Sequence, residues 1–402
     1  MRVLFLASYF PKPGNPEMGT WALSQAQALA RQDIELLVVS CTSKVPKFLA
    51  RTPGARAYAH CPATHTWPGG VHVCYPSWAY YPIKPFKTWA FANPTSYLTL
   101  AYWSVHNQLQ KLIKEFQPDI LFCNHSLPDG WVTAHFASRH GIPLITLDHD
   151  YDEILACDRF PCRASAMKVV ADQAWAMLAV SKKMEYILKQ LFPSANVLTQ
   201  HNGIDLISSS LFQKIRPPKL RDKKLILVCA FFAERKGIPL LIKSFCSIAA
   251  KHPDALLRII GSGPDQEKIR ETTKLHDLTQ QVQLIGKKNH QEVLQEMVWA
   301  DCFALTSWDE PFATVYLEAM AAGKPIICCN DGGITDVVFN QIHGLVVPPK
   351  DFSATAAALD SMLTNDRKRI EMGHNCQQLV QHELTWDAQI SKLMNLFKLA
   401  VG

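Results

Sequence analysis

Short apolar runs alternate with longer amphipathic segments along the chain, and this alternation restricts the fold more than any other feature. Each run has the length of one buried strand, and the segments between them have the length of helices. The first series of expected strands comprises residues 2–7, 35–40, 119–123, 143–147 and 177–180, with a helix at 21–31. Such an order predicts an α/β domain with a doubly wound parallel sheet.

A second series follows a polar, proline-containing stretch, residues 208–222, which we interpret as an interdomain linker. Its expected strands are residues 224–229, 256–260, 282–284, 302–305, 325–329 and 344–347. We therefore expect two Rossmann-like domains, residues 1–207 and 223–382. In such folds ligands bind beyond the carboxyl ends of the strands, where the motifs of this chain fall.

The bulk composition describes a folded protein, with 48% hydrophobic and 19% charged residues. The net charge of +6 permits anionic substrates or a membrane surface, and without a dense basic run no nucleic-acid partner is expected. The N-terminal apolar run is too short for a signal peptide, and residues 88–105 are too interrupted for a membrane span. We expect a cytoplasmic protein, with the inner face of the cell membrane as a further location.

The chain has 12 cysteines, several of them inside apolar runs, and we interpret them as reduced core thiols. Cys157 and Cys162 are close enough to suggest a metal site or a disulfide. No second pair of ligands at zinc-like spacing accompanies them, so the thiol interpretation is preferred.

Glu310 and Glu318 bracket a loop-to-helix turn. Free amides near Phe312, Ala313 and Thr314 would suit phosphate oxygens at the start of the helix, and the carboxylates would accept hydrogen bonds from hydroxyls. The combination suggests a sugar nucleotide. The alternative is a common helix start with acidic dipole partners, ended by Gly323 and Pro325.

Two further turns carry groups that suit phosphate. Arg235 and Lys236, followed by Gly237, come after the first strand of the second series and could neutralise a diphosphate. The alternative is an exposed basic turn. Gly261 and Gly263 form half of a dinucleotide fingerprint, which is weak evidence for a nucleotide when taken by itself.

His149 lies in an Asp-His-Asp-Tyr-Asp segment, residues 148–152, directly after an expected strand. An Asp-x-Asp pair often holds a divalent cation on a diphosphate. Because the chain already offers basic side chains and helix amides for that charge, we prefer His149 as a partner of a hydroxyl or phosphate. A structural histidine is the alternative.

Together these residues resemble the retaining GT-B glycosyltransferases of the GT4 family over nearly the whole chain. Glu310 to Glu318 matches the E-x7-E motif, and its continuation runs to Pro325. The other matching segments are Lys236-Gly237, Ile260-Gly261-Ser262-Gly263-Pro264, Asn202-Gly203-Ile204-Asp205, Pro118-Asp119-Ile120 and Pro128-Asp129-Gly130, the last two typical of polysaccharide-building members. The order and spacing of the motifs are more specific than any one of them.

The resemblance implies two Rossmann-like domains facing a cleft, and a C-terminal helix, within residues 383–402, that crosses back to the first domain. It implies that Glu318 holds the ribose, that Lys236 and the amides near Ala313 and Thr314 hold the diphosphate, and that Glu310 contacts the donor sugar. His149 would face that sugar, and Gly19 would approach the phosphates. No metal or other cofactor is implied, and the nucleotide sugar is a co-substrate.

The implied reaction transfers a hexose from a UDP-, GDP- or ADP-sugar to a sugar or lipid-linked acceptor, in cell-surface polysaccharide or glycolipid synthesis. The family mechanism is a front-face attack in which a phosphate oxygen takes the proton. Three positions depart from the family pattern: Phe231 replaces a phosphate-binding arginine, Ala313 replaces a glycine, and Asp150 places an acid near the sugar.

Aromatic residues gather between Tyr80 and Trp103, which suits peripheral contact with a bilayer. Cationic flanks accompany them, with Lys84 and Lys87 before the aromatic helix and Lys111 and Lys114 after it. The alternative is a loop and helix packed on the first domain. Two other functions remain open at this point: a sugar-nucleotide epimerase of the same shape, and an inactive nucleotide-sugar-binding partner, which the loss of the arginine at Phe231 favours.

Overall fold

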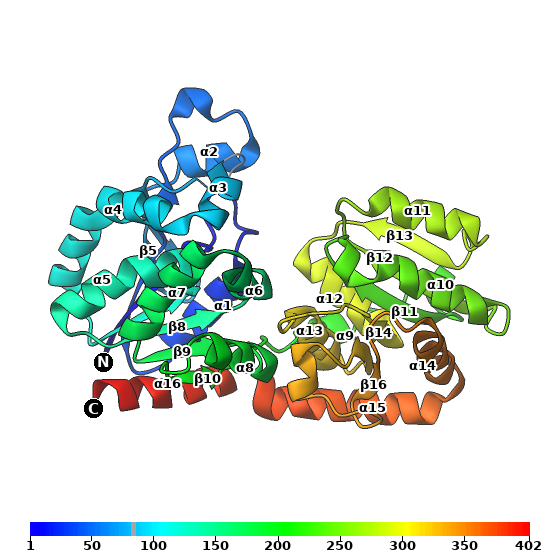
Figure 1. Cartoon of the computed structure of the whole chain (residues 1–402). Helices are drawn as coiled ribbons and strands as arrows, with labels where there is room; N and C mark the ends of the chain where they lie inside the picture. The colour runs from blue at the N-terminus through cyan, green and yellow to red at the C-terminus, as the bar shows by residue number, and fades with distance from the viewer. Residues whose placement is uncertain (82–85) are drawn as a thin grey trace. The chain divides into compact units, whose positions relative to one another are not determined.

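In the computed structural model, which describes residues 1–81 and 86–402, the chain forms two α/β units. Unit 1 comprises residues 1–201 and 389–402, and unit 2 comprises residues 202–388. Each unit is built on its own sheet with helices on both faces (Figure 1). The predicted fold class is confirmed.

The sheet of unit 1 has eight strands in the order β10-β9-β8-β7-β1-β2-β5-β4. The strands are β1 (Arg2–Leu6), β2 (Glu35–Val39), β4 (Thr64–Trp67), β5 (Val71–Cys74), β7 (Ile120–Asn124), β8 (Leu144–Asp148), β9 (Ala176–Ala179) and β10 (Val197–Thr199). β4 pairs antiparallel with β5, whereas the other pairings are parallel. The hairpin of β4 and β5 was not predicted, because both short strands contain polar residues and neither is a continuous apolar run. β3 (Thr42–Ser43) and β6 (Ser77–Trp78) form a separate two-stranded ladder.

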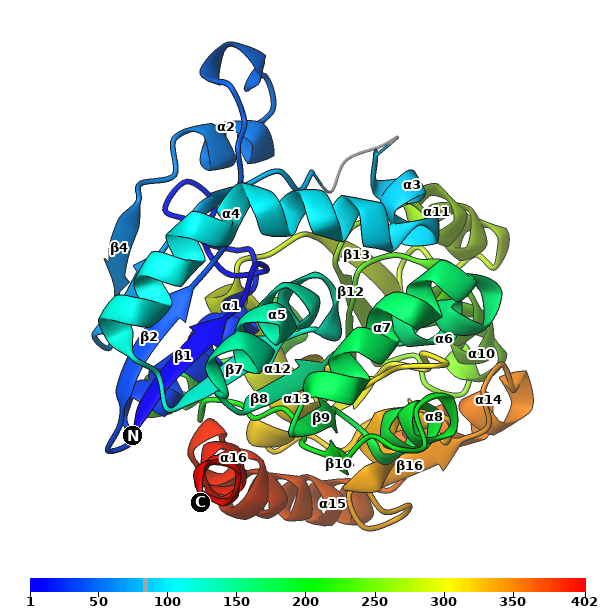
Figure 2. The same cartoon turned by 60° about the vertical axis from the view of Figure 1, so that its left-hand side comes forward.

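The helices of unit 1 flank this sheet. They are α1 (Thr20–Ala30), α2 (Pro53–Ala59), α3 (Phe86–Ala92), α4 (Pro94–Phe116), α5 (Trp131–His140), α6 (Tyr151–Arg159), α7 (Pro161–Gln173) and α8 (Lys182–Leu191). α4, α5 and α7 pack against one another in front of the central strands in Figure 2. Residues 88–105, which are too interrupted for a membrane span, are divided between α3 and α4. No helix in the described ranges is both long and apolar enough to cross a membrane.

Unit 2 has a six-stranded parallel sheet in the order β13-β12-β11-β14-β15-β16. The strands are β11 (Lys224–Cys229), β12 (Ala255–Ile260), β13 (Val282–Gly286), β14 (Cys302–Ala304), β15 (Ile326–Cys329) and β16 (Gly344–Val347). Its helices are α9 (Ser209–Phe212), α10 (Ile238–Ala249), α11 (Gln266–Leu275), α12 (His290–Trp299), α13 (Thr314–Ala321), α14 (Phe352–Thr364) and α15 (Asp366–Leu379). α10 packs with α11 and α14, and α13 packs with α12 and α15. Every predicted strand of this series is present.

The stretch predicted as a linker, residues 208–222, belongs to unit 2 rather than lying between the units. It holds α9, and its apolar residues Leu211 and Leu220 are buried. Leu220 packs with Leu225 and Leu256, which belong to β11 and β12. The few apolar side chains in this polar stretch are too widely spaced to show periodicity, yet they are enough to anchor it.

The last helix, α16 (Trp386–Val401), has residues in both units. At its start, the Trp386 amide donates to the Ile204 carbonyl within unit 2. From Gln389 onward the helix belongs to unit 1, where Gln200 Nε2 donates to Gln389 Oε1 at 2.9 Å. Phe397 packs against Phe122 of β7, with 5.4 Å between ring centroids.

All 12 cysteines are free thiols, and most are buried. Cys157 is buried in α6, whereas Cys162 is exposed near the start of α7. Burial raises the pKa of the Cys157 thiol to about 11, which keeps it protonated near neutral pH. The buried thiols are small core residues.

Candidate functional site

Glu310 is the centre of a charged cluster in unit 2, in the loop between β14 and α13. Only 5% of this residue is exposed. Its Oε2 accepts hydrogen bonds from Lys236 Nζ at 2.5 Å, Arg235 Nη1 at 2.9 Å and Ser307 Oγ at 2.6 Å. The sequence assigned Lys236 to a diphosphate and Glu310 to a sugar. In the structure these two side chains pair with each other, because a nearly buried carboxylate and a nearly buried ammonium each need an opposite charge.

The turn that carries Arg235 and Lys236 is fastened to the Glu310 loop. It is a single 3₁₀ turn after β11, closed by Gly237 at φ +67°. A Cβ at Gly237 would lie 2.6 Å from the Thr306 carbonyl oxygen, so a larger residue would force the two loops apart. The Arg235 carbonyl accepts a bond from the Trp308 amide at 3.0 Å. These contacts explain why residues about 75 positions apart in sequence meet at one oxygen.

Gly261, at the end of β12, has a packing reason for being glycine. Its φ is +138°, and a Cβ there would lie 1.9 Å from the Ala230 carbonyl oxygen. Its amide donates to the Gly286 carbonyl at 3.1 Å. The predicted role of Gly261 in donor binding stays a prediction, while its tight contact with the segment after β11 explains the residue type.

The first turn of α13 lies at the carboxyl edge of the sheet. The helix begins at Thr314, as expected, and its N-cap residue, Ala313, has no side-chain group that could cap it. Phe312 is buried beneath the turn. Tyr316 Oη donates to the Leu305 carbonyl at 2.6 Å and ties the helix to the end of β14. This start therefore presents backbone amides rather than a side-chain cap, as an anion site requires.

Glu318 lies one turn into α13 and is paired with His290, the first residue of α12. His290 Nε2 lies 3.1 Å from Glu318 Oε1. This hydrogen bond raises the pKa of His290, with a smaller contribution from the charge of Asp205. His290 was not among the predicted site residues. The available signal was the capping box of Asn289 and Glu292, which marks the start of a helix directly after β13.

In unit 1, His149 follows β8 and lies beside Trp21 of α1, with 4.0 Å between ring centroids. Its Nε2 lies 3.2 Å from Asn124 Oδ1. Burial lowers the pKa of His149 well below its usual value, and nearby His125 lowers it further. The imidazole is therefore neutral near pH 7, and one of its nitrogens can donate while the other accepts.

Gly19 precedes α1 on the same side of unit 1. It has φ +64°, and a Cβ there would lie 2.3 Å from the Tyr9 carbonyl oxygen. Trp21, two residues later, contacts His149, so the structure brings the Gly19 loop and the histidine together. The glycine is needed for this close chain approach.

A buried polar network supports the loop before Gly19. Asp129 accepts bonds from the amide and the hydroxyl of Ser8. Lys12 Nζ donates to the Ser8 and Phe10 carbonyls and to Ser40 Oγ. Burial lowers the pKa of Lys12 to about 8 and raises that of Asp129 to about 6. The Pro128-Asp129-Gly130 motif thus has a structural role in holding the first loop.

The Asp-x-Asp pair is divided between two roles. Asp148 is buried, and its two carboxylate oxygens accept bonds from the Ser126 amide and hydroxyl. Asp150 is exposed at the start of α6. In residues 1–81 and 86–402, no group of three or more His, Cys, Asp or Glu side chains is placed to hold a metal ion.

Phe231 occupies the position of the family's arginine and is 63% exposed. Arg235 lies beside Lys236 on the same carboxylate oxygen, so a second cation is present in the cluster. Within unit 2 the structure therefore gathers Arg235, Lys236 and Glu310, whereas Glu318 forms a separate pair with His290.

Comparisons with known proteins identify the family that the chain resembles. A family model described as Glycosyltransferase Family 4 matches residues 18–207, and one described as Glycosyl transferases group 1 matches residues 211–379. The glycogen synthase of Mycobacterium tuberculosis is 25% identical over 285 residues, covering 68% of this chain and 67% of that protein.

Two solved structures share the fold. Sucrose-phosphate synthase from Thermosynechococcus elongatus matches with a TM-score of 0.78 at 18% identity, over 99% of each chain. HepE of Anabaena, in complex with UDP-glucose, matches with a TM-score of 0.68 at 17% identity, over 98% of this chain and all of the other (100%). These structures show the fold. The family models and the sequence match to glycogen synthase support the predicted transferase and give no support to the epimerase or the inactive partner.

Proposed function

The chain belongs to the family 4 glycosyltransferases, and from this premise we propose that it transfers a hexose with retention of anomeric configuration and without a metal ion. The donor is a nucleoside diphosphate sugar, and the acceptor is a hydroxyl of a sugar or lipid-linked glycan. The observation that carries the proposal is the convergence of Lys236 and Arg235 on Glu310 beside the start of α13.

This cluster can exchange one anion for another. In the structure, Glu310 neutralises Lys236 and Arg235. We propose that the diphosphate takes over these cations together with the amides near Ala313 and Thr314, and that Glu310 then accepts hydrogen bonds from hydroxyls of the donor sugar. Fixed cations and amides that stabilise the departing diphosphate supply the role that a metal ion would otherwise have.

In the proposed reaction the acceptor oxygen bonds to the anomeric carbon on the face from which the diphosphate leaves. The bond between that carbon and the phosphate oxygen breaks with its electron pair on the diphosphate. A phosphate oxygen takes the acceptor proton, so no side chain has to act as base or nucleophile. Glu318 is assigned to the ribose hydroxyls and neutral His149 to a sugar hydroxyl, as the family resemblance implies.

For the acceptor we propose contact with a lipid surface through α3 and α4. Trp89, Leu100 and Trp103 are exposed there, Trp103 to 68%. Lys84, part of the predicted contact, lies outside the described residues. Exposed aromatic side chains suit the interfacial layer of a bilayer.

In sedimentation with phosphatidylglycerol vesicles, the double variant Leu100→Gln with Trp103→Gln should lower vesicle binding about tenfold. Tyr186→Gln, an exposed residue of α8, serves as control, and equal binding by all three proteins contradicts the contact.

The donor proposal is tested by thermal shift with UDP-, GDP- and ADP-sugars, each with and without EDTA. A ligand at about 100 times its dissociation constant stabilises the folded state by about 2.7 kcal/mol. One nucleotide series should raise the melting temperature, and EDTA should leave the rise unchanged. If no nucleotide sugar raises it, the donor site is wrong; if EDTA abolishes the rise, metal independence is wrong. NMR of the transferred anomeric proton tests retention.

A further inference from the structure

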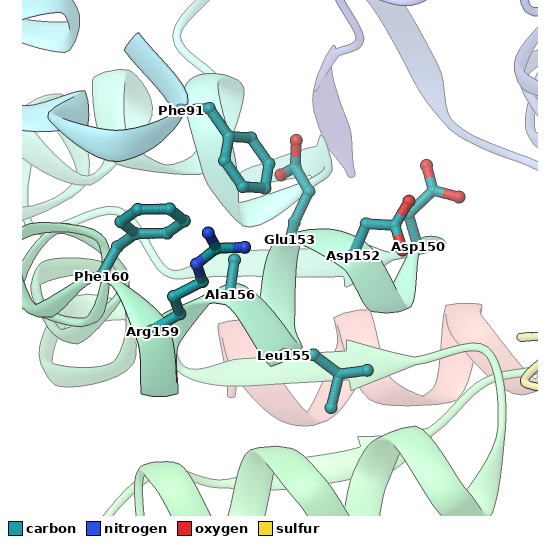
Figure 3. Close-up of a pocket in the computed structure, with 8 residues that line it drawn as sticks. All are labelled: Phe91, Asp150, Asp152, Glu153, Leu155, Ala156, Arg159 and Phe160. Carbon is teal, nitrogen blue, oxygen red and sulfur yellow. The ribbon is translucent and has the colours of Figure 1, made fainter. Parts of the chain in front are cut away.

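A cavity of about 600 Å³ lies in unit 1 beside α6, and all of its lining residues belong to that unit. Its lining residues are Phe91, Asp150, Asp152, Glu153, Leu155, Ala156, Arg159 and Phe160. Figure 3 shows the two phenyl rings near Arg159 and, at the other end, Asp150 and Asp152. We propose that this cavity binds the sugar of the acceptor and selects a neutral or amino sugar over an anionic one, an inference that rests on the proposed transferase function.

The apolar end of the cavity is rigidly built. Phe91 and Phe160 lie edge to face at 5.9 Å between centroids. Behind them, buried Arg163 stacks on Phe91 at 4.2 Å and donates to the Phe91 and Glu153 carbonyls. Aromatic walls with a few fixed polar groups are usual in small-molecule sites, and a pyranose ring offers its apolar C–H face to such a wall.

The charges of the cavity determine which ligand fits. Glu153 is neutralised by Arg163, whose Nη2 lies 3.1 Å from Glu153 Oε2. Asp150 and Asp152 then outweigh Arg159, which leaves a net charge of about −1 on the lining. A diphosphate or a uronic acid is repelled by this charge. Neutral hydroxyls donate hydrogen bonds to the carboxylates, and an ammonium is attracted to them.

A helix-dipole role explains only part of the acidic set. Asp152 and Glu153 occupy the first turn of α6, where acids are common. Asp150 occupies the N-cap position, yet its side chain makes no capping hydrogen bond. It directly follows His149, so the cavity adjoins the residue assigned to the sugar. Asp150 is also the position where the chain departs from the family's glycine.

The test compares three ligands with one ring: methyl β-glucoside, methyl β-glucosaminide and methyl β-glucuronide, titrated by saturation-transfer NMR without donor. One net charge at ~6 Å in water changes affinity about threefold, so the glucosaminide should bind about tenfold more tightly than the glucuronide. The double variant Asp150→Asn with Asp152→Asn leaves Arg159 in excess and should reverse this order.

Asp158→Asn is the matched control, since Asp158 is an exposed acid of α6 that does not line the cavity. It should change the affinities little. Phe160→Ala should weaken all three ligands, and the exposed aspartate variants keep the test valid if Phe160→Ala does not fold. The inference is overturned if the glucuronide binds as well as the glucosaminide, or if the double variant keeps the original order. A donor-induced thermal shift under those results would leave the transferase proposal intact.

Discussion

Replacing Glu310 with glutamine should separate the two roles of the charged cluster. The carboxylate is nearly buried and holds Lys236, whose side chain is 12% exposed, and Arg235, which is 38% exposed. Glutamine keeps the size of the side chain but removes its charge. In the free protein, the two cations lose their counter-ion. In the donor complex, they still face the diphosphate, while the sugar loses a strong acceptor of hydrogen bonds.

The expected size follows from these contacts. Removing one partner of a buried ion pair costs about 3–5 kcal/mol, and the exposure of Arg235 reduces this to about 2 kcal/mol. For a unit of roughly 190 residues, the melting temperature should fall by about 4–8 °C. A phosphate ~8 Å from Glu310 is repelled by about 0.5–2 kcal/mol, so the variant should bind nucleoside diphosphate about two- to thirtyfold more tightly. Turnover should fall at least about tenfold.

Three measurements on one protein preparation test this: thermal melting, calorimetric titration with the nucleoside diphosphate, and initial-rate kinetics with the nucleotide sugar. Glu234→Gln is the control, because Glu234 is an exposed acid in the same turn as Lys236. It should leave all three quantities nearly unchanged. Weaker nucleotide binding by Glu310→Gln, together with an unchanged melting temperature, would refute the idea that Glu310 acts as the counter-ion that the donor displaces.

Two further predictions concern the supporting structure. Gly261→Ala should destabilise unit 2 by about 3 kcal/mol or more in thermal melting, because its Cβ would lie 1.9 Å from the Ala230 carbonyl oxygen. Gly54→Ala is the control and should not lower stability, because there is open space around its Cβ. Equal melting temperatures of the two variants would contradict this packing role. Because Glu318 raises the pKa of His290, the contribution of protonated His290 to stability is complete below about pH 6.5 and is lost as the pH rises through the raised value. In urea denaturation, the free energy of unfolding of the wild type should fall by less than about 1 kcal/mol in that pH window, since the His290 side chain is 66% exposed. His290→Ala should lack this loss. If the unfolding free energies of both proteins change equally with pH, the pairing is refuted.

Most of the fold could be predicted from the sequence because buried parallel strands are continuous apolar runs. Residues 224–229 and 344–347, for example, were predicted with the observed bounds of β11 and β16. The hairpin of β4 and β5 was not predicted because both short strands contain polar residues and neither is a continuous apolar run. The stretch 208–222, predicted as a linker, falls within unit 2, where two separated leucines anchor an otherwise polar segment.

Some residues of the candidate site could likewise be predicted from the sequence, and others could not. Glu310, Glu318 and the basic turn could be identified from local patterns. These patterns are the glycines and prolines that mark turns and the spacing of acids around a helix start. His290 was missed because the capping box of Asn289 and Glu292 marks only the start of a helix, and the partner of the histidine, Glu318, is 28 positions away. Phe231 stands where the family has an arginine, so the sequence pattern lacks one positive charge of the cluster. In the structure Arg235 donates to the Glu310 carboxylate and is a second cation there.

The sequence by itself determined the two α/β series, the start of α13 and the residue types available for phosphate and hydroxyls, because these depend on local periodicity, on caps and on turns. Only the tertiary structure decided which charged and polar groups pair with one another. Lys236, Arg235 and Ser307 meet at one oxygen of Glu310, Asp129 supports the first loop rather than a ligand, and Asp150 lines a cavity. The physical reason is that pairing depends on distance in space, and parallel strands bring loops distant in sequence to the same edge of a sheet.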